Sequence, residues 1–391
     1  MKKLLLSVLL AALLLSLAAC GGPAEPTNAS PPDTTAPTEE PPPPEEPAQG
    51  QVRILNTDPE LNQIWDILAE EYTRLTGTDV QIVAEEADLP TLRRVLSRDE
   101  LPESCADLSQ TNACAQLISQ ELTLRDEEGA VLAVADSIEV YGLMYNSTLL
   151  AQTANTRDDI NSFADLTEVV YSITDAKDSL GFSAFARVDP DDHFALQIAT
   201  LTGDSRNLVE LIMNNTTGDP LAVEEGTKSE ALQDFLEGKA VFFLAGSAEQ
   251  AVLDAIGSEN IGVLPVYIGG ENEEKQTLCV APRSFWCVDA GTSEADVQAT
   301  VDFLEFLTMP RADGTVPADA LGRVTPYRQA AYVSNVPEVV LRADLAMGKE
   351  PVVCRYMVQV PPGLTDALVA YVADPSDNNW AAIRDILEAI E

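Results

Sequence analysis

The segment Val52–Val83 constrains the fold of this chain more than any other, because its pattern predicts a strand, a helix and a second strand in direct succession. In its middle part, apolar residues recur every three or four positions, as on the buried face of an amphipathic helix. These apolar residues are Leu61, Ile64, Trp65, Leu68, Ala69, Tyr72 and Leu75. A strand, a crossover helix and a strand form a parallel pair, so we expect the folded region to open with a βαβ unit.

Both ends of this helix carry residues that favour helix termini. Asp58 can accept hydrogen bonds from the free N–H groups of the first turn, and Pro59 fits the first helical position. Gly77 supplies the left-handed residue that ends the helix. The loop that holds Asn56 and Asp58 then lies at the carboxyl end of the first strand, where open α/β sheets bind their ligands. Asn56 and Asp58 are therefore the first candidate ligand-binding residues.

The charge of the chain limits its partners. Its 391 residues carry a formal net charge of −41, which disfavours binding to nucleic acid or to an anionic membrane face. With 64 Asp and Glu residues, pairs of carboxylates arise by chance, so no pair by itself indicates catalysis. The length suffices for two lobes with cores of their own. We expect an acidic, soluble protein that binds no nucleic acid.

The N-terminus has the pattern of an export signal. Lys2 and Lys3 precede an apolar run from Leu4 to Ala19, which at sixteen residues is shorter than the ~20 needed to span a bilayer. The sequence LAAC that ends at Cys20 resembles the lipobox of bacterial lipoproteins. That resemblance implies cleavage before Cys20, lipidation of Cys20, and anchoring to the outer face of the bacterial cytoplasmic membrane.

A proline-rich segment follows the lipobox. Residues 21–50 contain ten prolines together with Thr, Glu and Ala. This composition cannot form a hydrophobic core and favours an extended tether. We expect the folded part to begin near Gln51.

Five cysteines follow Cys20, an odd number for an oxidising location. Cys105 and Cys114 close a short polar loop, and we expect a disulfide between them. Cys279 and Cys287 lie about 26 Å apart on a straight strand, so they can pair only if the residues between them turn. The sequence leaves the pairing of Cys279, Cys287 and Cys354 open. There is no C-x-x-C motif and only one His, so we expect no metal site and no cofactor.

Further elements follow from the pattern of the remaining chain. We expect a short helix around Leu92–Leu96. Strands are predicted at 131–134, 138–146, 181–188, 240–245 and 261–268, with a strand pair over 278–288. Helices are predicted at 162–174, 191–201, 231–236, 247–256 and 380–390, and after Ser293 up to Pro310.

Six segments in fixed order carry a resemblance to a known family. They are NTDPELNQIWDILAEEYTRLTGTDVQIV, EVYGLMYNSTLL, FLEGKAVFFLAGS, IGVLPVYIG, FWCVD and VQATVDFLEFL. Together they resemble the extracellular solute-binding proteins of ABC importers, specifically the maltose-binding-like carbohydrate group. The resemblance implies an α/β fold of the type II periplasmic-binding-protein kind, with two lobes, hinge strands and a cleft between the lobes. It also implies no enzymatic activity, a monomer, and ABC importer permease subunits as partners.

The resemblance also divides the chain. Residues 1–19 are the expected signal peptide, and 20–50 the lipidated Cys20 with its tether. The N-terminal lobe comprises 51–146 and 287–320. The C-terminal lobe comprises 147–286 and 321–391.

Candidate ligand residues carry over from the family one by one. Glu139 matches an acidic position that contacts sugar hydroxyls, which suits a carboxylate with two acceptor oxygens. Tyr141 lies near it on the same strand. The other matching positions are Asp58 on the first loop, His193 and Phe194 at a helix start, Gly246 and Ser247 at a turn, and Trp286. The chain departs from the family pattern at Ala248, where the family usually has a stacking Trp, and at Pro282-Arg283.

Structural roles are the alternatives at these positions. Tyr141 fits packing in a core or hinge better than ligand contact. Trp286 fits a ligand-stacking face and a core position equally well. Glu139 suits either a ligand contact or bonding to backbone donors. His193 fits a capping or surface position better than a ligand contact.

The resemblance implies a receptor that captures a small polar solute, in the first place a carbohydrate. One alternative is a related receptor for an anionic solute read by Arg283. Another is a lipoprotein that has lost transport and acts as a sensor or scaffold. A surface hydrolase is disfavoured, because the chain has no G-x-S-x-G, no H-E-x-x-H and no Gly-rich phosphate loop, and a single His.

Overall fold

The computed structural model confirms the predicted βαβ unit at the start of the folded region. Strand β1 (Val52–Leu55) and strand β2 (Val80–Val83) pair in parallel, and helix α1 (Asn62–Thr76) connects them. The Asp58 carboxylate accepts a hydrogen bond from the Glu60 N–H at 3.0 Å, within a short 3-10 turn that precedes α1. Gly77 ends α1 with a positive φ of 80°, a conformation that glycine adopts without steric cost.

The buried face of α1 agrees with the prediction except in its last turn. Trp65, Leu68, Ala69 and Tyr72 are buried. Leu75 is 58% exposed, because the end of α1 lies outside the hydrophobic cluster that Leu68 and Tyr72 join. Its assignment to the buried face was therefore wrong.

The structure describes residues 50–188, 193–217, 228–246, 255–330 and 336–390. The signal segment, Cys20 and the tether up to residue 49 lie outside these ranges, as does most of the helix predicted at 247–256.

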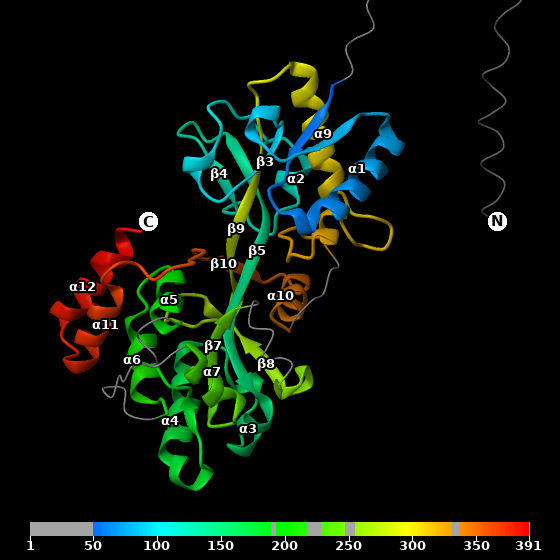
Figure 1. Cartoon of the computed structure of the whole chain (residues 1–391). Coiled ribbons are helices and arrows are strands. Elements are labelled where there is room, and N and C mark those ends of the chain that lie inside the picture. Colours follow the sequence, from blue (N-terminus) through cyan, green and yellow to red (C-terminus); the bar gives the residue numbers. More distant parts are fainter. Residues whose placement is uncertain (1–49, 189–192, 218–227, 247–254, 331–335, 391) are drawn as a thin grey trace, which may run out of the picture. The chain divides into compact units, whose positions relative to one another are not determined.

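The described residues form one sheet with the strand order β2-β1-β3-β9-β5-β7-β6. In addition, β10 pairs with β9, and β4 and β8 pair with β5 (Figure 1). The further strands are β3 (Leu92–Val95), β4 (Thr123–Arg125), β5 (Val131–Asn146), β6 (Ser183–Phe185), β7 (Ala240–Gly246), β8 (Ile261–Leu264), β9 (Gln276–Val288) and β10 (Glu350–Val353).

Two long antiparallel strands, β5 and β9, form the middle of this sheet. The sequence predicted two separate pieces for each of these strands. In the structure each strand is continuous, because its polar residues also pair with the neighbouring strand. The register shifts around Ser137 mark the place where the prediction had put a break in β5. The helix predicted at Leu92–Leu96 was wrong: these residues form β3, since β3 pairs with β9 and tertiary pairing overrides a weak local pattern.

Helices cover the sheet. They are α2 (Asn112–Ala115), α3 (Ser147–Gln152), α4 (Phe163–Leu180), α5 (His193–Thr200), α6 (Arg206–Asn214), α7 (Lys228–Leu236), α9 (Glu294–Thr308), α10 (Val336–Ala346), α11 (Leu364–Ala373) and α12 (Asp377–Glu388). Most of the predicted helices and strands are confirmed, with boundaries that differ by a few residues. Within the described part of the chain, no helix has the length and apolar character needed to cross a membrane.

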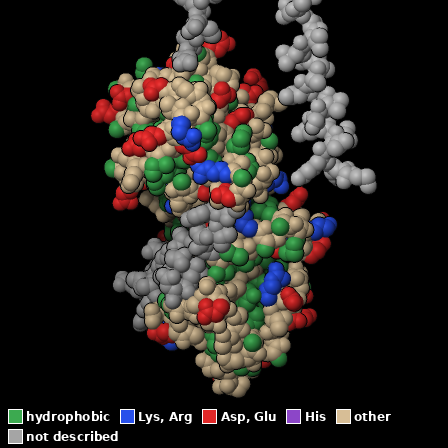
Figure 2. Space-filling view, turned by 90° about the vertical axis from the view of Figure 1, so that its right-hand side faces the viewer, with side chains coloured by type: hydrophobic (Ala, Val, Ile, Leu, Met, Phe, Trp, Pro, Cys, Tyr) green, Lys and Arg blue, Asp and Glu red, His purple; other side chains and the backbone are tan. Residues whose placement is uncertain are grey.

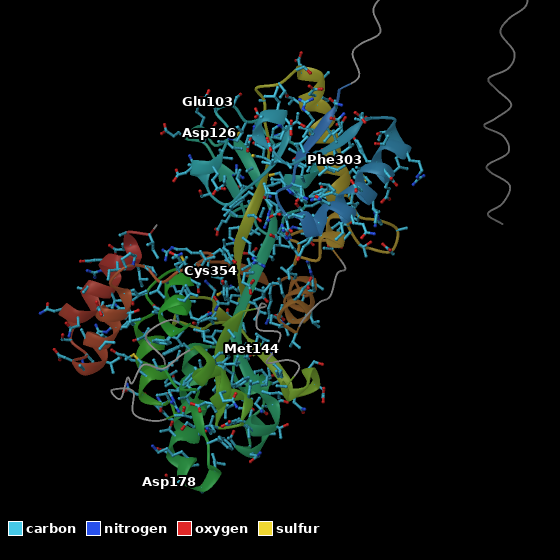
Figure 3. All side chains as sticks on the ribbon, in the orientation of Figure 1. Glu103, Asp126, Met144, Asp178, Phe303 and Cys354 are labelled. Carbon is cyan, nitrogen blue, oxygen red and sulfur yellow. The ribbon has the colours of Figure 1, made fainter. Side chains whose placement is uncertain are left out.

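The apolar side chains form two hydrophobic clusters. The first cluster contains residues of α1, β1, β3 and α9, and Phe303 is among its largest buried side chains (Figure 3). The second cluster contains residues of α4, α5, α6, α11 and α12, and it includes Cys354. Strands β5 and β9 contribute to both, for example Trp286 to the first and Cys279 to the second. The first cluster also includes residues of α7, β7 and β8, among them Phe235 and Phe243. The residue boundaries of the lobes stay a prediction.

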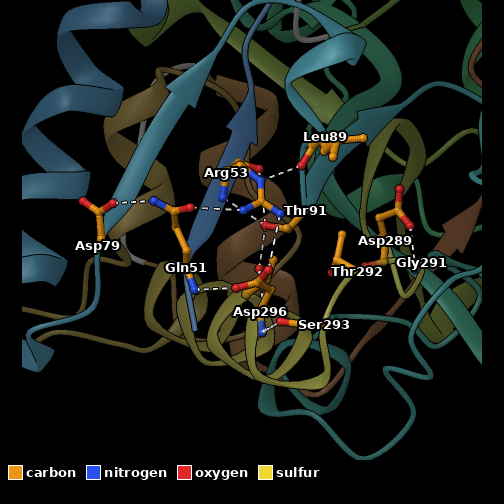
Figure 4. Close-up of polar contacts among 11 residues, drawn as sticks. Gln51, Arg53, Asp79, Leu89, Thr91, Asp289, Gly291, Thr292, Ser293 and Asp296 are labelled. Carbon is orange, nitrogen blue, oxygen red and sulfur yellow. Dashed lines mark hydrogen bonds and ion pairs between the residues drawn. The ribbon is translucent and has the colours of Figure 1, made fainter. Parts of the chain in front are cut away.

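Polar contacts hold the start of the folded region, at Gln51 and Arg53, against the rest of the structure (Figure 4). The Gln51 N–H donates to the Asp296 carboxylate at 2.8 Å, and the Arg53 guanidinium forms an ion pair with the same carboxylate at 3.4 Å. Arg53 also donates to the Leu89 carbonyl at 2.6 Å. Asp296 lies in the first turn of α9, which Ser293 caps by accepting the Asp296 N–H. The first strand, the loop before β3 and α9 are thereby joined by one carboxylate and one guanidinium.

We predict that Asp296→Asn lowers the free energy of unfolding by about 1.5 to 3 kcal/mol at neutral pH, the usual value of hydrogen bonds to a charged group. Burial raises the pKa of Asp296, but the bonds from Gln51, Ser293 and Arg53 outweigh it and leave the pKa below its usual 3.8. A lowered folded-state pKa contributes stability above the unfolded pKa, and this is lost as the pH falls through the folded value. The difference between variant and wild type should therefore shrink below about pH 4.

Urea unfolding at pH 7 and at pH 3 measures this difference. Glu294→Gln is the matched control, because it removes an exposed charge from the same helical turn without touching Gln51 or Arg53. Equal destabilisation by both variants would assign the effect to the helix dipole and contradict the prediction.

Candidate ligand-binding site

A pocket of about 310 Å³ opens at the carboxyl ends of β1 and β3, the place where open α/β sheets bind ligands. It contains apolar walls, three arginines and three carboxylates. The lining residues that carry polar or aromatic groups are Asn56, Thr57, Asp58, Trp65, Arg93, Arg94, Glu100, Asp136, Trp286 and Arg323. On the face that Figure 2 presents, Lys and Arg side chains gather across the middle of the molecule among acidic neighbours.

Asn56 and Asp58 both lie in this pocket, as the sequence predicted for the first loop. The Asn56 side-chain amide donates to the Asp58 carbonyl at 2.8 Å and to the Asn62 side-chain oxygen at 2.7 Å. Its own side-chain oxygen accepts the Asp58 N–H at 3.3 Å. Asn56 thus fixes the shape of the loop, while Asp58 holds the start of the helix and faces the same pocket.

Trp286 lines the pocket but belongs to its wall. It lies on β9, opposite Arg94 of β3 and Val134 of β5, and only 2% of its surface is exposed. Trp286 is part of the first hydrophobic cluster together with Trp65. The side chain therefore presents an edge to the pocket from a packed position.

Asp136 is the central polar group of the site, and sequence reasoning missed it. The carboxylate is 3% exposed and forms ion pairs with Arg94 at 3.0 Å and with Arg323 at 3.3 Å. It also accepts hydrogen bonds from the Ser137 and Ser284 hydroxyls. Two guanidinium groups thus share one buried carboxylate. The signal in the sequence was an acidic residue in the middle of the apolar run 131–146, since a buried carboxylate requires cationic partners.

Arg323 and Arg283 add further positive charge near Asp136. Burial lowers the pKa of Arg323, and the charges of Arg94 and Arg283 lower it further, against the opposing charge of Asp136. Arg283 itself donates to the Tyr356 hydroxyl at 3.2 Å and lies over the Tyr356 ring, 5.3 Å from its centroid. Three arginines from β3, β9 and the segment after α9 therefore influence one another around a single buried carboxylate.

Glu139, Tyr141 and Gly246 form a second group, on the paired strands β5 and β7. Tyr141 lies opposite Gly246 in the register, and a Cβ atom at position 246 would come within 2.7 Å of a Glu139 carboxylate oxygen. Gly246 is therefore required by close approach of the neighbouring side chains. Glu139 and Tyr141 are both buried, and burial together with the Glu139 charge raises the pKa of Tyr141. Arg283 lies on β9 between Pro282, which is opposite Ile138, and Ser284, whose hydroxyl donates to the Asp136 carboxylate.

Among the remaining predicted positions, the Phe194 side chain is described, and it does not line the pocket. Phe194 is buried in the second cluster, beside Phe185, Phe242 and Phe243. His193 begins α5, and its side chain lies outside the described residues, as do Ser247 and Ala248.

The predicted Cys105–Cys114 disulfide is absent from the structure, where both residues are free thiols. The segment around Cys105 lies along β9, where Cys105 pairs with Asp289, two positions from Cys287, and its thiol donates to the Pro102 carbonyl at 3.6 Å. The Cys114 side chain is buried in α2 and contacts Gln120. All five described cysteines are free thiols in the structure, so the Cys105–Cys114 pairing stays a prediction.

The sheet order, the two hydrophobic clusters and the pocket at the strand ends define a solute receptor with the type II periplasmic-binding-protein fold, as the sequence predicted. A model of the family described as bacterial extracellular solute-binding protein matches residues 48–337. The chain therefore belongs to this family of non-enzymatic receptors for ABC import.

Solved structures support the fold. A family 1 extracellular solute-binding protein from Bifidobacterium longum subsp. infantis has a TM-score of 0.61 at 15% identity, over 87% of this chain and 98% of that one. RafE of Streptococcus pneumoniae in its apo form has a TM-score of 0.60 at 14% identity, over 88% and 98%. The bacterial solute receptor AcbH, described as preferring β-D-galactopyranose exclusively, has a TM-score of 0.61 at 10% identity, over the same shares. No curated protein matches the chain.

We predict that Asp136→Asn destabilises the protein by about 3 kcal/mol, because removing one partner of a buried ion pair leaves the others uncompensated. Arg323 bears most of this cost, since its side chain is more buried than that of Arg94. Chemical unfolding measures the loss. Glu103→Gln is the control, as it removes an exposed carboxylate elsewhere in the same lobe. An Asp136→Asn variant as stable as this control would show that the arginines need no carboxylate between them.

Proposed function

We propose that this protein is a lipid-anchored extracellular receptor that captures a polar small solute, in the first place a carbohydrate, and delivers it to an ABC importer. The observation that carries the proposal is the pocket at the carboxyl ends of β1 and β3, where side-chain donors and acceptors lie beside tryptophan and leucine walls. A sugar ring presents hydroxyls at its edge and an apolar C–H face, so it needs both kinds of surface.

The pocket supplies the two kinds of group from different elements. Asp58 and Asp136 are acceptors, whereas Arg94 and Arg323 are donors only. Trp65 and Leu61 form part of the apolar wall. The volume of about 310 Å³ lies at the lower end of the range for small-molecule sites, which suits one or two sugar rings better than a long oligosaccharide. The preference of AcbH for a single galactopyranose supports a solute of this size.

The second group extends the proposed site. Glu139 and Tyr141 lie on β5, three and five positions beyond Asp136, and Arg283 connects them electrostatically to Arg323. We place the ligand between these two groups. The protein acts as a monomer and needs no metal or cofactor in this role.

An acidic solute is the second candidate, and the arginine arrangement favours it. Arg94 and Arg323 share the single carboxylate of Asp136, and Arg283 has the neutral Tyr356 hydroxyl as its partner. Around Asp136, two guanidinium groups thus face one carboxylate, in a chain of net charge −41. A carboxylate or sulfate on the solute would pair with these guanidinium groups through their N–H donors.

A thermal-shift screen against matched neutral hexoses and hexuronic acids distinguishes the two candidates. Stabilisation by neutral sugars supports the first, and stabilisation by the acids alone supports the second. A chain that responds to neither class would be the sensor or scaffold that has lost transport.

For the solute that the screen identifies, we predict that Glu139→Gln weakens binding tenfold to a hundredfold, the effect of losing a charge-assisted hydrogen bond of about 1.5 to 3 kcal/mol. Trp286→Phe should weaken it less, since Trp286 exposes only an edge. Trp286→Ala should lower stability by about 3 to 5 kcal/mol with or without solute, because the side chain is packed in the core.

Titration calorimetry and melting temperatures on the same variants measure both effects, with Glu103→Gln as the control for loss of a carboxylate. Unchanged affinity in Glu139→Gln would remove the second group from the site and restrict the ligand to the pocket beside Asp136.

The lipid anchor makes a separate prediction. Cys20→Ser removes the thiol that the lipobox pattern assigns to lipidation. We expect the variant to keep its signal peptide pattern but to lose lipid and to leave the membrane fraction. Metabolic labelling with a fatty acid and fractionation measure this. Membrane retention equal to that of the wild type would contradict the lipobox assignment.

A further inference from the structure

Strand β9 carries two cysteines that cannot pair with each other. Cys279 and Cys287 are eight positions apart on one continuous strand, which separates them by about 26 Å. The residues between them do not turn, so the condition for a Cys279–Cys287 disulfide is not met. Cys287 belongs to the first hydrophobic cluster and Cys279 to the second.

Cys287 lies next to Cys105 through the strand register. Cys105 forms an antiparallel bridge with Asp289, and the flanking backbone bonds join Ala106 to Val288 at 2.9 Å and Ala290 to Ser104 at 3.0 Å. Cys287 is two positions from Asp289, so its side chain points to the same face as that of Cys105. The Cys105 and Cys287 side chains are therefore diagonal neighbours on this face.

Cys279 has an equivalent neighbour in Cys354. Strands β10 and β9 are parallel, with Val352 opposite Cys279, and the Cys354 N–H continues the ladder by donating to the Val280 carbonyl at 2.9 Å. Cys354 is two positions beyond Val352 and therefore shares its face of the sheet with Cys279. Both side chains are buried, and Cys354 is the diagonal neighbour of Cys279 across the two strands.

Cys114 is the cysteine left over. It is buried in the first cluster, and its thiol lies 3.5 Å from the Gln120 side-chain oxygen. The odd number of cysteines after Cys20 is thus divided into two neighbouring pairs and one enclosed thiol.

We propose that the exported protein contains two disulfides, Cys105–Cys287 and Cys279–Cys354, and that Cys114 remains a thiol. In each pair the two cysteines are diagonal neighbours on one face of adjacent backbone segments that are already fixed by ladder bonds. Diagonal neighbours have Cα atoms roughly 7–8 Å apart, so bond formation draws the two backbone segments slightly together. The oxidant is an external disulfide of the kind that secreted thiol–disulfide oxidoreductases carry.

The chemistry at the first pair assigns different roles to the two thiols. Cys105 is partly exposed, and the neighbouring Cys287 thiol lowers its pKa, whereas the Cys105 thiol and burial raise the pKa of Cys287. The Cys105 thiolate attacks the external disulfide, which forms a mixed disulfide and releases one external thiolate. Cys287 then gives its proton to solvent and attacks the Cys105 sulfur, expelling the second external thiolate. Two protein thiols are oxidised and one external disulfide is reduced to two thiols.

The second pair has no exposed member. Cys279 and Cys354 are both buried in the second cluster, and the neighbouring Cys279 thiol, together with burial, raises the pKa of Cys354. An oxidant reaches such thiols while the chain is folding, before the cluster closes. Once formed, this disulfide is shielded from reductant, whereas Cys105–Cys287 is open to it.

Each proposed bond stays within one hydrophobic cluster. Cys105 and Cys287 fasten the segment before α2 to β9, where Ala106 packs on the first cluster. Cys279 and Cys354 fasten the segment after β10 to the other half of β9, in the second cluster. Neither bond ties one cluster to the other, so both are compatible with the receptor function while stabilising the strand that passes through both.

Peptide mapping by mass spectrometry tests the proposal on the full chain exported by a bacterial host, alkylated under denaturing conditions without reductant. Trypsin cleaves after Lys275, Arg283 and Lys349, so Cys279, Cys287 and Cys354 fall in three separate peptides. Cys105 and Cys114 share one tryptic peptide, and cleavage before Asp107 by an Asp-specific protease separates them. We expect linked peptides for 105–287 and 279–354, and an alkylated Cys114.

Matched variants sharpen the test. Cys114→Ser should leave both linkages intact, whereas Cys105→Ser should free Cys287 alone. Mild reductant applied to the native protein should open 105–287 several-fold faster than 279–354. Loss of both disulfides should lower the melting temperature by on the order of 5 to 10 °C, because both bonds close long loops. A 105–114 linkage, or five free thiols in the exported chain, would overturn the proposal.

Discussion

The pairing of β5 with β9 is the interaction on which the rest of the structure depends. Both strands are long enough to contribute to two hydrophobic clusters. Along most of their length, the backbone N–H and C=O groups of one strand hydrogen-bond to those of the other. A break in either strand would leave buried N–H and C=O groups unpaired in the middle of the sheet. The βαβ unit at the N-terminus, the helices of the second cluster and the pocket beside Trp286 are all attached to this pair, directly or through one neighbouring strand.

Charge is distributed unevenly around this pair. The chain as a whole is strongly acidic, yet the pocket beside β9 collects Arg94 and Arg323 around the buried Asp136. Removing such charges from water is costly, and their arrangement is tolerated because the carboxylate is also bonded to two hydroxyls. A site that keeps donors in a fixed position, with Arg283 close by, can recognise the hydroxyls or the carboxylate of a solute without first rearranging.

The cysteines show how strand register controls chemistry. Cys105 and Cys114 are nine positions apart in the chain, and Cys105 and Cys287 are 182 apart, yet it is the second pair that the strand register makes neighbours. Disulfide geometry requires sulfur atoms to approach within bonding distance, which only tertiary pairing can arrange for residues so far apart. The same reasoning explains why β3 is a strand: its pairing with β9 supplies hydrogen bonds that a short isolated helix could not match.

Local pattern was sufficient to determine the βαβ unit, with Asp58 and Gly77 at the helix ends, and most of the helices and strands after it. Those features depend on periodicity and capping, which act over a few residues. The βαβ pattern predicted Asn56 and Asp58 as site residues, and the family resemblance predicted Asp58 and Trp286; all three line the same pocket, while their role in ligand binding stays a prediction. The tertiary structure alone decided that Trp286 is mostly buried, that Glu139 and Tyr141 form a separate group, and that Asp136 holds two arginines. These facts depend on contacts between residues far apart in the chain, and no local propensity encodes the register that brings them together.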